Sequence, residues 1–260
     1  MKIATWNVNS LNVRLEQVIE WLKFNSVDVL CLQEIKMINE KFPSKVFSEI
    51  GYHCVFSGQK TYNGVAIISK KIGSDILYKI TESDDAQKRF IAMTISSSLN
   101  QKIRIICIYC PNGQSIESEK YIYKLKWFES LYHFLKKELK FYQYCAILGD
   151  YNVAPSNIDT YNPEIISDNI LISKLERKAF NRLLKLGLFD AFRLFEQPEK
   201  SFTWWDYRRE SFKKNIGFRI DHILLSKELC KICNDCSIDF TPRKKKRPSD
   251  HTPVIATLDF

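Results

Sequence analysis

Short apolar runs rich in β-branched and aromatic residues recur along the whole chain, and this pattern limits the fold more than any other feature of the sequence. Runs of this kind predict buried β-strands. They cover residues 3–6, 27–32, 65–69, 90–95, 103–109, 144–148, 218–225 and 253–258. Between some of them, residues 14–24, 118–139 and 173–186 carry apolar side chains at helical spacing. Since strands and helices alternate without a strict βαβ rhythm, we expect an α/β sandwich with mixed sheets.

The length of the chain allows one or two domains, and its composition favours one. Its 260 residues are 45% hydrophobic, which is enough for a sizeable core. No Gly/Ser-rich linker or low-complexity segment divides the sequence. We therefore expect a single domain over residues 1–260.

Successive predicted strands end in, or run into, residues that can do chemistry. These residues are Asn7, Asn9, Glu34, Tyr109, Asn112, Asp150, Asn152, Asp221, Asp250 and His251. α/β sheets place functional sites at strand ends, because a rigid scaffold aims the side chains there. In an extended segment, residues i and i+2 share a face. Asp150 and Asn152 can therefore point into one cleft together, as can Asn7 and Asn9.

The residue types in this set favour metal-assisted hydrolysis. Carboxylate and amide oxygens suit a hard divalent cation such as Mg²⁺. An aspartate and a histidine beside such a cation suit hydrolysis of a phosphate ester. The sequence contains no P-loop and no GxGxxG motif, so nucleotide triphosphate binding and hydride transfer lack support. Each of these residues, taken alone, is more often a turn, helix-cap or surface residue than a catalytic one.

The charge of the chain favours an anionic partner. Its formal net charge is +9, from 39 basic and 30 acidic residues. Nucleic acid is the first candidate and an anionic membrane the second. The longest apolar runs are far shorter than the ~20 residues needed to cross a bilayer, and no secretory signal is recognisable. We therefore expect no membrane contact.

The eight cysteines are expected to be reduced thiols, because no secretory signal is recognisable. Three of them lie close together in the segment CKICNDC, at Cys230, Cys233 and Cys236. Their spacing could suit zinc or an iron–sulfur cluster. No fourth ligand of matching spacing accompanies them, so packing at the edge of an element is the favoured interpretation.

Eight segments of the chain, in this order, resemble the exonuclease III family of apurinic/apyrimidinic (AP) endonucleases, within the endonuclease/exonuclease/phosphatase superfamily. They are TWNVNS, DVLCLQEIK, GVAIIS, IYCPNG, ILGDYNVAP, FTWWDYR, FRIDHILLS and PSDHTPV. The resemblance extends over essentially the whole chain. It implies a four-layered α/β sandwich, in which two mixed β-sheets pack face to face with helices outside. FTWWDYR and YCPNG favour the DNA-repair branch over the inositol-phosphatase and sphingomyelinase branches.

The resemblance also implies an activity. It is that of a Mg²⁺-dependent nuclease, with Mn²⁺ as a substitute, that cleaves the DNA backbone 5′ to abasic sites. 3′-Phosphatase, 3′-phosphodiesterase and 3′→5′ exonuclease activities often accompany this cleavage. The alternative is an enzyme that mainly processes 3′ ends and has little AP-endonuclease activity. The expected partner is double-stranded DNA with abasic sites or blocked 3′ ends, and we expect a cytoplasmic, nucleoid-associated monomer.

The metal and the attacking water are assigned to five residues by the resemblance. Glu34 would be the principal Mg²⁺ ligand, with Asn7 beside it. Asp250 would lie near the metal. Asp150 would be the base or would orient the water, and Asn152 would help to hold the nucleophile and the phosphate.

The scissile phosphate is assigned to residues from three further segments. His251 would contact it, as would Tyr109 and Asn112. Asp221 would hydrogen-bond His251 and favour its charged form, because an adjacent carboxylate raises the pKa of an imidazole.

An apolar pocket for the extruded, baseless sugar is assigned to Trp204, Phe218 and Ile220. Such a sugar is compact and costs little to extrude. Since successive strand residues face opposite ways, at most one of Trp204 and Trp205 can line this pocket.

Basic residues supply candidates for the rest of the DNA-binding face. They are Lys60, Arg89, Lys120, Arg208, Arg209 and Lys245. Lys245 belongs to a run of five basic residues at 243–247, next to His251. Three interpretations of this run remain open: a contact with the DNA backbone, a localisation signal and a solvated loop.

Overall fold

Two mixed β-sheets form the centre of the protein, as predicted, and the described residues give each of them six strands. The computed structural model describes residues 1–80, 85–96, 101–162, 164 and 169–260. The first sheet has the strand order β11-β12-β1-β2-β4-β3 and the second β5-β6-β7-β8-β10-β9. Each sheet contains one parallel pair, β1–β2 and β7–β8, among antiparallel neighbours.

The strands have the following bounds. Those of the first sheet are β1 (Lys2–Asn7), β2 (Val29–Gln33), β3 (His53–Ser57), β4 (Val65–Ser69), β11 (Cys233–Ile238) and β12 (Val254–Leu258). Those of the second sheet are β5 (Ser74–Leu77), β6 (Phe90–Ser96), β7 (Lys102–Tyr109), β8 (Tyr144–Asp150), β9 (Leu188–Asp190) and β10 (Asp221–Ser226).

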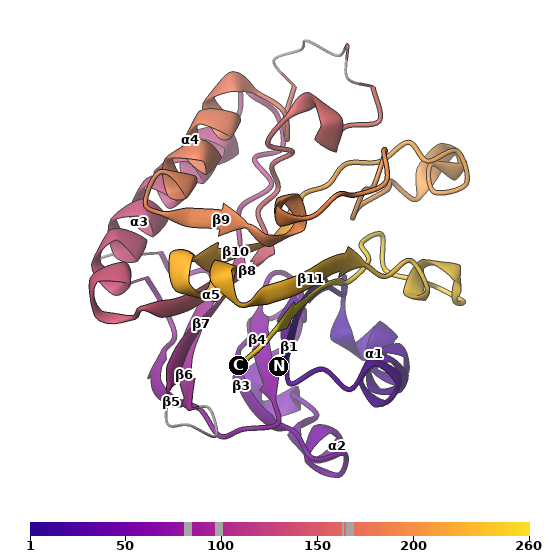
Figure 1. Cartoon of the computed structure of the whole chain (residues 1–260). Helices are drawn as coiled ribbons and strands as arrows, with labels where there is room; N and C mark the ends of the chain where they lie inside the picture. The colour runs from indigo at the N-terminus through magenta and orange to yellow at the C-terminus, as the bar shows by residue number, and fades with distance from the viewer. Residues whose placement is uncertain (81–84, 97–100, 163, 165–168) are drawn as a thin grey trace.

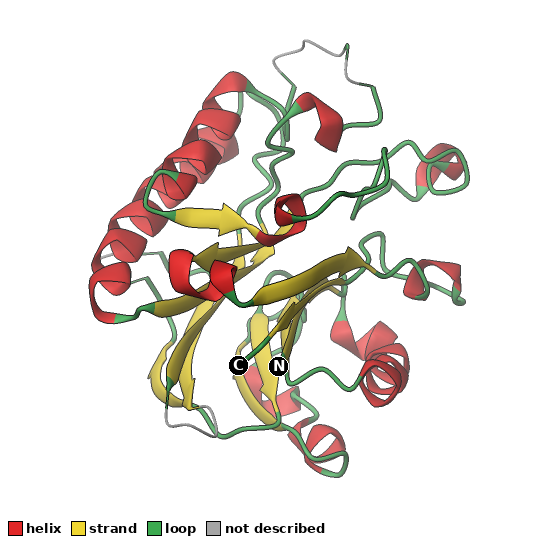
Figure 2. Ribbon diagram, viewed as in Figure 1, coloured by secondary structure: helices red, strands yellow, loops and turns green. Residues whose placement is uncertain are grey.

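Helices cover the outer face of each sheet (Figures 1 and 2). Their bounds are α1 (Leu11–Asn25), α2 (Ser44–Ser48), α3 (Glu119–Phe141), α4 (Lys174–Leu184) and α5 (Lys227–Lys231). The helix α4 begins at a capping box, in which Ser173 and Glu176 each bond the backbone N–H of the other. The helices α1 and α2 pack on the first sheet, and α3 and α4 on the second.

The alternation of side chains along each strand builds three apolar layers. In β2, Val29 and Cys31 point into the core between the two sheets, whereas Leu30 and Leu32 pack beneath α1 and α2. The same alternation in the second sheet separates the core between the sheets from the layer under α3 and α4. Full burial of such a side chain contributes about 1.5–3 kcal/mol, so the sandwich holds its two sheets firmly together.

The predicted strand over residues 218–225 is shorter than expected. The regular strand β10 begins only at Asp221, because its partner β8 ends at Asp150, the residue that pairs with Asp221. Before that point, Phe218 forms isolated bridges with Thr160 and Trp204. Four strands were not predicted at all, namely β3, β5, β9 and β11, and each of them is an edge strand.

The CKICNDC segment forms the junction between α5 and β11. Cys230 belongs to the helix, Cys233 begins the strand, and Cys236 is buried in the core between the sheets. This placement agrees with packing at the edge of an element. Among the described helices, none is long and apolar enough to cross a membrane.

A buried network of charges fixes the segment that leads into β10. The Arg219 guanidinium lies between two carboxylates, 2.6 Å from Asp159 Oδ1 and 2.7 Å from Asp190 Oδ2. Its Nη1 lies 3.0 Å from His222 Nδ1, and His222 Nε2 lies 2.9 Å from the Val153 carbonyl oxygen. This pattern suits a neutral imidazole that carries its proton on Nε2. Burial, reinforced by the Arg219 charge, lowers the pKa of His222 to about 4.

We expect His222 to make stability depend on pH in mild acid. Below the ordinary histidine pKa of about 6.5, this histidine is protonated in the unfolded chain but stays neutral in the folded protein. The free energy of unfolding therefore falls as the pH falls from about 6.5 towards 4. His222→Gln keeps a donor for Val153 and an acceptor for Arg219. The free energy of unfolding of the wild type, relative to this variant, should therefore drop by about 3 kcal/mol between pH 7 and pH 4. Urea unfolding of both proteins at the two pH values measures this, and an identical pH dependence would contradict it.

Candidate active site

Polar side chains from both sheets meet at one end of the sandwich. Asn7 is the last residue of β1, Glu34 directly follows β2, and Tyr109 and Asp150 end β7 and β8. In the second sheet, Asp150 pairs with both Tyr109 and Asp221, so the three lie side by side. The Asn7 amide donates one hydrogen bond to Glu34 Oε1 and one to Asp150 Oδ2, both at 2.9 Å. Asn7 therefore joins the acidic residues of the two sheets.

Glu34 is held by three neighbours. Its Oε1 accepts hydrogen bonds from Asn7 and, at 2.9 Å, from the Tyr109 hydroxyl. Its Oε2 lies 2.7 Å from Lys36 Nζ, which also donates to Asn9 Oδ1 at 2.5 Å. Burial alone would raise the pKa of Glu34, but Lys36 and the other donors outweigh burial and hold the pKa below its ordinary value. Lys36 was not among the predicted site residues, and its position two residues after Glu34 is the signal that could have found it.

His251 lies between two buried carboxylates. Its Nδ1 is 2.8 Å from Asp221 Oδ2, and its Nε2 is 3.8 Å from Asp150 Oδ2. Burial would lower the pKa of His251, but the charges of Asp221 and Asp150 raise it to about 10. The imidazole is therefore protonated at neutral pH and can donate from both nitrogens. Burial raises the pKa of Asp150 above its ordinary value, with the His251 charge opposing the change.

Asn7 lies beside Asn9 and Asp150 beside Asn152, but turns bring each pair together and not the extended chain that was predicted. Asn9 and Asn152 have φ angles of 43° and 51°, so both stand in turns and not in extended chain. In each turn the backbone N–H donates to the side chain two residues earlier, Asn9 to Asn7 Oδ1 at 3.0 Å and Asn152 to Asp150 Oδ1 at 2.8 Å. Such turns are typical of Asn and Asp side chains.

Asn152 also connects the site to the loop after β7. Its Oδ1 accepts a hydrogen bond from Asn112 Nδ2 at 3.1 Å, and its own Nδ2 donates to the Cys110 carbonyl oxygen at 3.0 Å. The two amides thus form one unit at the mouth of the site.

One group of side chains in the described part of the chain could hold a metal ion. It consists of Glu34, Asp150 and His251, whose ligand atoms all lie within 4.8 Å of one another. A protonated His251 has no free lone pair, so the two carboxylates are the members of this group that could bind a cation. Asp250, predicted as a metal residue together with Asn7 and Glu34, is outside this group. Its Oδ1 accepts from Asn9 Nδ2 and its Oδ2 from Trp204 Nε1, both at 2.9 Å. A role for Asp250 at the metal stays a prediction.

The predicted pocket residues Trp204, Phe218 and Ile220 form one small apolar cluster beside His251. They pack with Ala154, Ile170, Leu171 and Ile172. The Trp204 ring centroid is 6.0 Å from that of Phe218 and 6.5 Å from that of His251. Leu171 has a φ of 74° and was missed, since nothing in the sequence indicates that its loop returns to the site. Trp205 points the other way, as predicted, and is buried with its Nε1 bonded to Asn215.

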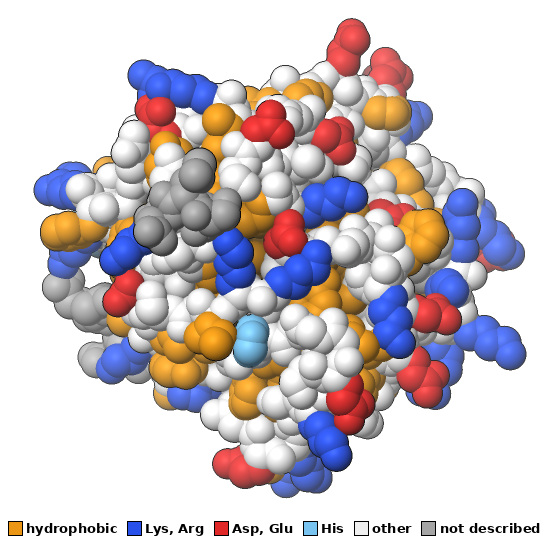
Figure 3. Space-filling model, turned by 60° about the horizontal axis from the view of Figure 1, so that its bottom comes forward, with side chains coloured by type: hydrophobic (Ala, Val, Ile, Leu, Met, Phe, Trp, Pro, Cys, Tyr) orange, Lys and Arg blue, Asp and Glu red, His pale blue; other side chains and the backbone are white. Residues whose placement is uncertain are grey.

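The basic candidates occupy different surroundings. Arg89 and Lys120 line a groove of about 860 Å³ together with Tyr109 and Asn112, whereas Lys60 shares a second groove with Lys36. Arg208 is exposed and paired with Asp206, Lys245 is paired with Glu20, and Arg209 is exposed. Figure 3 shows a face of the molecule on which lysine and arginine are spread among acidic side chains. DNA contacts by these residues stay predictions.

In the basic run at 243–247, the first residue, Arg243, is neither solvated nor exposed to DNA. Arg243 is only 7% exposed, and its guanidinium lies over the rings of Phe212, Trp205 and Tyr207, at 4.7, 5.7 and 5.9 Å. It also donates to the Ser249 carbonyl oxygen. Arg243 therefore packs the loop before His251 against the loop that carries Trp204.

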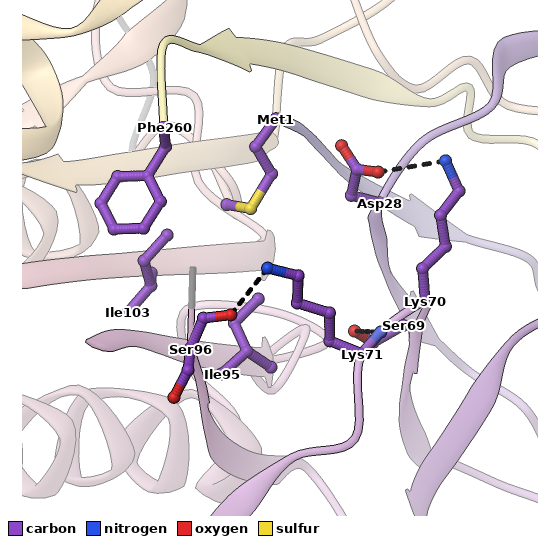
Figure 4. Close-up of a pocket in the computed structure, with 9 residues that line it drawn as sticks. All are labelled: Met1, Asp28, Ser69, Lys70, Lys71, Ile95, Ser96, Ile103 and Phe260. Atoms are coloured by element: carbon purple, nitrogen blue, oxygen red, sulfur yellow. Dashed lines mark hydrogen bonds and ion pairs between the residues drawn. The ribbon is translucent and has the colours of Figure 1, made fainter. Parts of the chain in front are cut away.

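The opposite end of the sandwich lacks a comparable set of side chains among the residues described there. It holds a cavity of about 210 Å³ near both chain termini (Figure 4). Its charged groups are already paired, Lys70 with Asp28 at 3.0 Å and Lys71 with the Ser96 carbonyl oxygen at 2.8 Å. The end that carries His251 is therefore the candidate active site.

Comparison with known proteins identifies the family. The model of the endonuclease/exonuclease/phosphatase family matches residues 4–251. The chain belongs to this family. It is 34% identical to exodeoxyribonuclease III of Haemophilus influenzae, over 98% of this chain and 99% of the relative. It is therefore a hydrolase of the family, similar to the exodeoxyribonucleases.

Solved structures confirm the four-layered sandwich of this family member. A structure of the 3′ phosphatase NExo from Neisseria, bound to a product DNA hairpin, superposes with a TM-score of 0.96 at 44% identity. An AP endonuclease from Archaeoglobus fulgidus superposes with a TM-score of 0.94 at 41% identity. Both matches cover 100% of each chain.

Proposed function

We propose that this protein is a Mg²⁺-dependent DNA-repair nuclease that hydrolyses the phosphodiester bond on the 5′ side of abasic sites. The observation that carries the proposal is the position of the protonated His251, which lies beside Asp150 on one side and beside the apolar cluster of Trp204 on the other. A phosphate and the sugar attached to it need these two environments next to each other.

The donor set fits a hard divalent cation. The carboxylates of Glu34 and Asp150 converge on Asn7, and oxygen ligands of this kind suit Mg²⁺ and also Mn²⁺. The Lys36 ammonium, 2.7 Å from Glu34 Oε2, shows that this carboxylate attracts a cation. Glu34 would hold the metal. Asn7 would have to turn its amide to offer an oxygen beside Glu34, because its Nδ2 faces both carboxylates and its Oδ1 accepts the Asn9 N–H. When bound, the metal would neutralise charge on the phosphate.

The chain's own residues would carry the proton transfers. Asp150 accepts a proton from the attacking water, which adds to phosphorus while the bond to the 3′-oxygen breaks. His251 donates its Nε2–H to a phosphate oxygen and stabilises the growing negative charge. Asp221 keeps the ring charged and oriented through Nδ1. The leaving 3′-oxygen takes up a proton from water and becomes a 3′-hydroxyl, and the other product is a 5′-deoxyribose phosphate.

The cluster of Trp204, Phe218 and Ile220 would receive the baseless sugar. Such a sugar presents an apolar face and has little stacking to lose. The groove of Arg89 and Lys120 would carry the flanking backbone of double-stranded DNA, where basic side chains neutralise phosphates. Since DNA is the proposed substrate, we propose a nucleoid-associated protein of the cytoplasm that acts as a monomer.

A second candidate is processing of blocked 3′ ends by the same residues, with little cleavage at abasic sites. It is favoured by the similarity to the Neisseria 3′ phosphatase, which is 44% identical, against 41% for the Archaeoglobus AP endonuclease. Both reactions break a bond between phosphorus and oxygen, so the same acid, base and metal serve them. They differ in whether a sugar must enter the apolar cluster.

Incision of a labelled duplex that contains one abasic-site analogue tests the proposal. The assay is run with Mg²⁺ and with EDTA, beside a matched duplex that carries a 3′-phosphate end. We expect Mg²⁺-dependent cleavage 5′ to the lesion. Removal of the 3′-phosphate without any incision would support the second candidate and would contradict the assignment of Trp204, Phe218 and Ile220 to an abasic sugar.

A further inference from the structure

A fully enclosed ion pair lies directly behind the candidate active site. It joins Lys124 of α3 to Glu176 of α4, and the exposed fraction of both side chains is 0%. Removing two charges from water costs several kcal/mol per ion, which their attraction offsets only when further hydrogen bonds satisfy both groups. The partners of this pair therefore indicate what it does.

Every donor of the Lys124 ammonium is used, and two of the acceptors are backbone atoms of the site. Nζ donates to the Asn152 carbonyl oxygen at 2.6 Å, to the Asn112 carbonyl oxygen at 3.2 Å and to Glu176 Oε1. These are the two residues whose side-chain amides bond each other at the mouth of the site. Lys124 thus fixes from behind the backbone of both residues whose amides are proposed to face the phosphate.

Glu176 extends the same network to the apolar cluster. Its Oε1 accepts the backbone N–H of Leu171 at 3.1 Å, and its Oε2 accepts the backbone N–H of Ser173 at 3.0 Å. Leu171 packs in the cluster of Trp204, Phe218 and Ile220. The ion pair therefore connects the phosphate side of the site to its sugar side.

The loop that carries Asn112 lies tightly against Lys124. Gly113 has a φ of 94°, and a Cβ there would approach Ile170 Cδ1 to 2.7 Å and Lys124 Cδ to 3.2 Å. This close fit leaves the loop little room to move relative to α3.

Stability alone does not explain a charged pair at this place. A pair of apolar residues of similar volume is often neutral or stabilising in comparison, but it could not bind two carbonyl oxygens and an N–H. We propose that Lys124 and Glu176 are positioning residues, which hold Asn112, Asn152 and Leu171 at a fixed spacing so that phosphate and sugar are aligned together. This inference rests on the proposed function of the site.

The test replaces both charges at once, because removing one would leave the other buried and unpaired. Lys124→Met with Glu176→Gln keeps both shapes and the helix cap. The matched control is Arg104→Met with Glu138→Gln, which neutralises a second largely buried pair, between β7 and α3, with 2.7 Å between Arg104 Nε and Glu138 Oε2. That control pair has no contact with the site residues in the described part of the chain.

We expect the kcat of the Lys124/Glu176 variant to fall about 10- to 100-fold, with little change in KM, because misplacement by about 1 Å can cost that much. The control should lose a comparable amount of thermal stability and keep its kcat. Because Lys124 would act through Asn112, the pair variant should lose much less in an Asn112→Ala background than in the wild-type background. An unchanged kcat in the Lys124/Glu176 variant would overturn the inference. So would an equal fold-loss of kcat in the wild-type and Asn112→Ala backgrounds.

Two provisions keep this experiment decisive. Turnover is measured on the abasic duplex and on the 3′-phosphate duplex. A wild-type protein that does not incise the abasic duplex refutes the proposed function. The kcat of the variant relative to the wild type on the 3′-phosphate duplex then still tests the role of the ion pair. If circular dichroism shows the double variant unfolded, Lys124→Arg is used instead, because it keeps the charge pair but changes the donors to the two carbonyl oxygens, and Arg104→Lys is its control. Equal kcat losses in these two variants would also overturn the inference.

Discussion

His251→Asn is expected to lower kcat for phosphodiester cleavage by about 10²- to 10⁴-fold, with the fold intact. The imidazole is enclosed, and the neighbouring Asp221 and Asp150 carboxylates keep it protonated by raising its pKa to about 10. Asparagine is smaller and neutral, so the phosphate would lose a charged donor at the point where negative charge develops. Steady-state kinetics on the abasic duplex, with circular dichroism as a check on folding, give the answer.

His133→Asn is the matched control for this variant, because His133 is an exposed histidine on α3. It should retain wild-type kinetics. A His251→Asn protein that is folded and stays within about tenfold of the wild-type kcat would remove His251 from the reaction and would refute the assignment of the charged donor.

Glu34→Gln is expected to weaken metal binding and to lower kcat at a fixed Mg²⁺ concentration by at least ~100-fold. The substitution keeps the size of the side chain and removes the negative charge that attracts a cation. The Glu34 side chain is ionised at neutral pH, since Lys36 and other donors hold its pKa below its ordinary value despite burial. Calorimetric titration with Mn²⁺ measures binding independently of turnover.

Glu20→Gln provides the corresponding control, because Glu20 is an exposed carboxylate that pairs only with Lys245 among the described residues. Its metal affinity and kcat should match the wild type. Unchanged Mn²⁺ binding in Glu34→Gln would show that the metal is held elsewhere and would refute the assignment of Glu34 as its ligand.

The central strands could be predicted from the sequence, whereas the edge strands could not. Strands such as β7 and β8 are buried on both faces, so they must be almost continuously apolar. The edge strands β3, β5, β9 and β11 are partly exposed and contain polar residues. Each of them pairs with one other strand, the next along the chain, and lacks the second neighbour that buries a central strand, so its apolar pattern is weaker.

Much of the candidate site was predictable for a related reason. Asn7, Glu34, Tyr109 and Asp150 each end or follow a strand, and the fold gathers these ends at one place. The residues that were missed lie behind or beside that set. Lys124 and Glu176 are 52 residues apart on two helices, where a lysine and a glutamate look like ordinary solvated charges.

The two sheets supply separate halves of the site, so activity depends on how the sheets are placed relative to each other. Asn7 and Glu34 belong to the first sheet and Asp150 and Tyr109 to the second, and the Asn7–Asp150 and Tyr109–Glu34 hydrogen bonds cross the interface. The spacing of the reacting groups is therefore set by the apolar side chains between the sheets, such as Ile3. Slippage of one sheet past the other by an ångström would disable the enzyme while leaving each half intact, so a substitution deep in the core can be as damaging as one at the acid or the base.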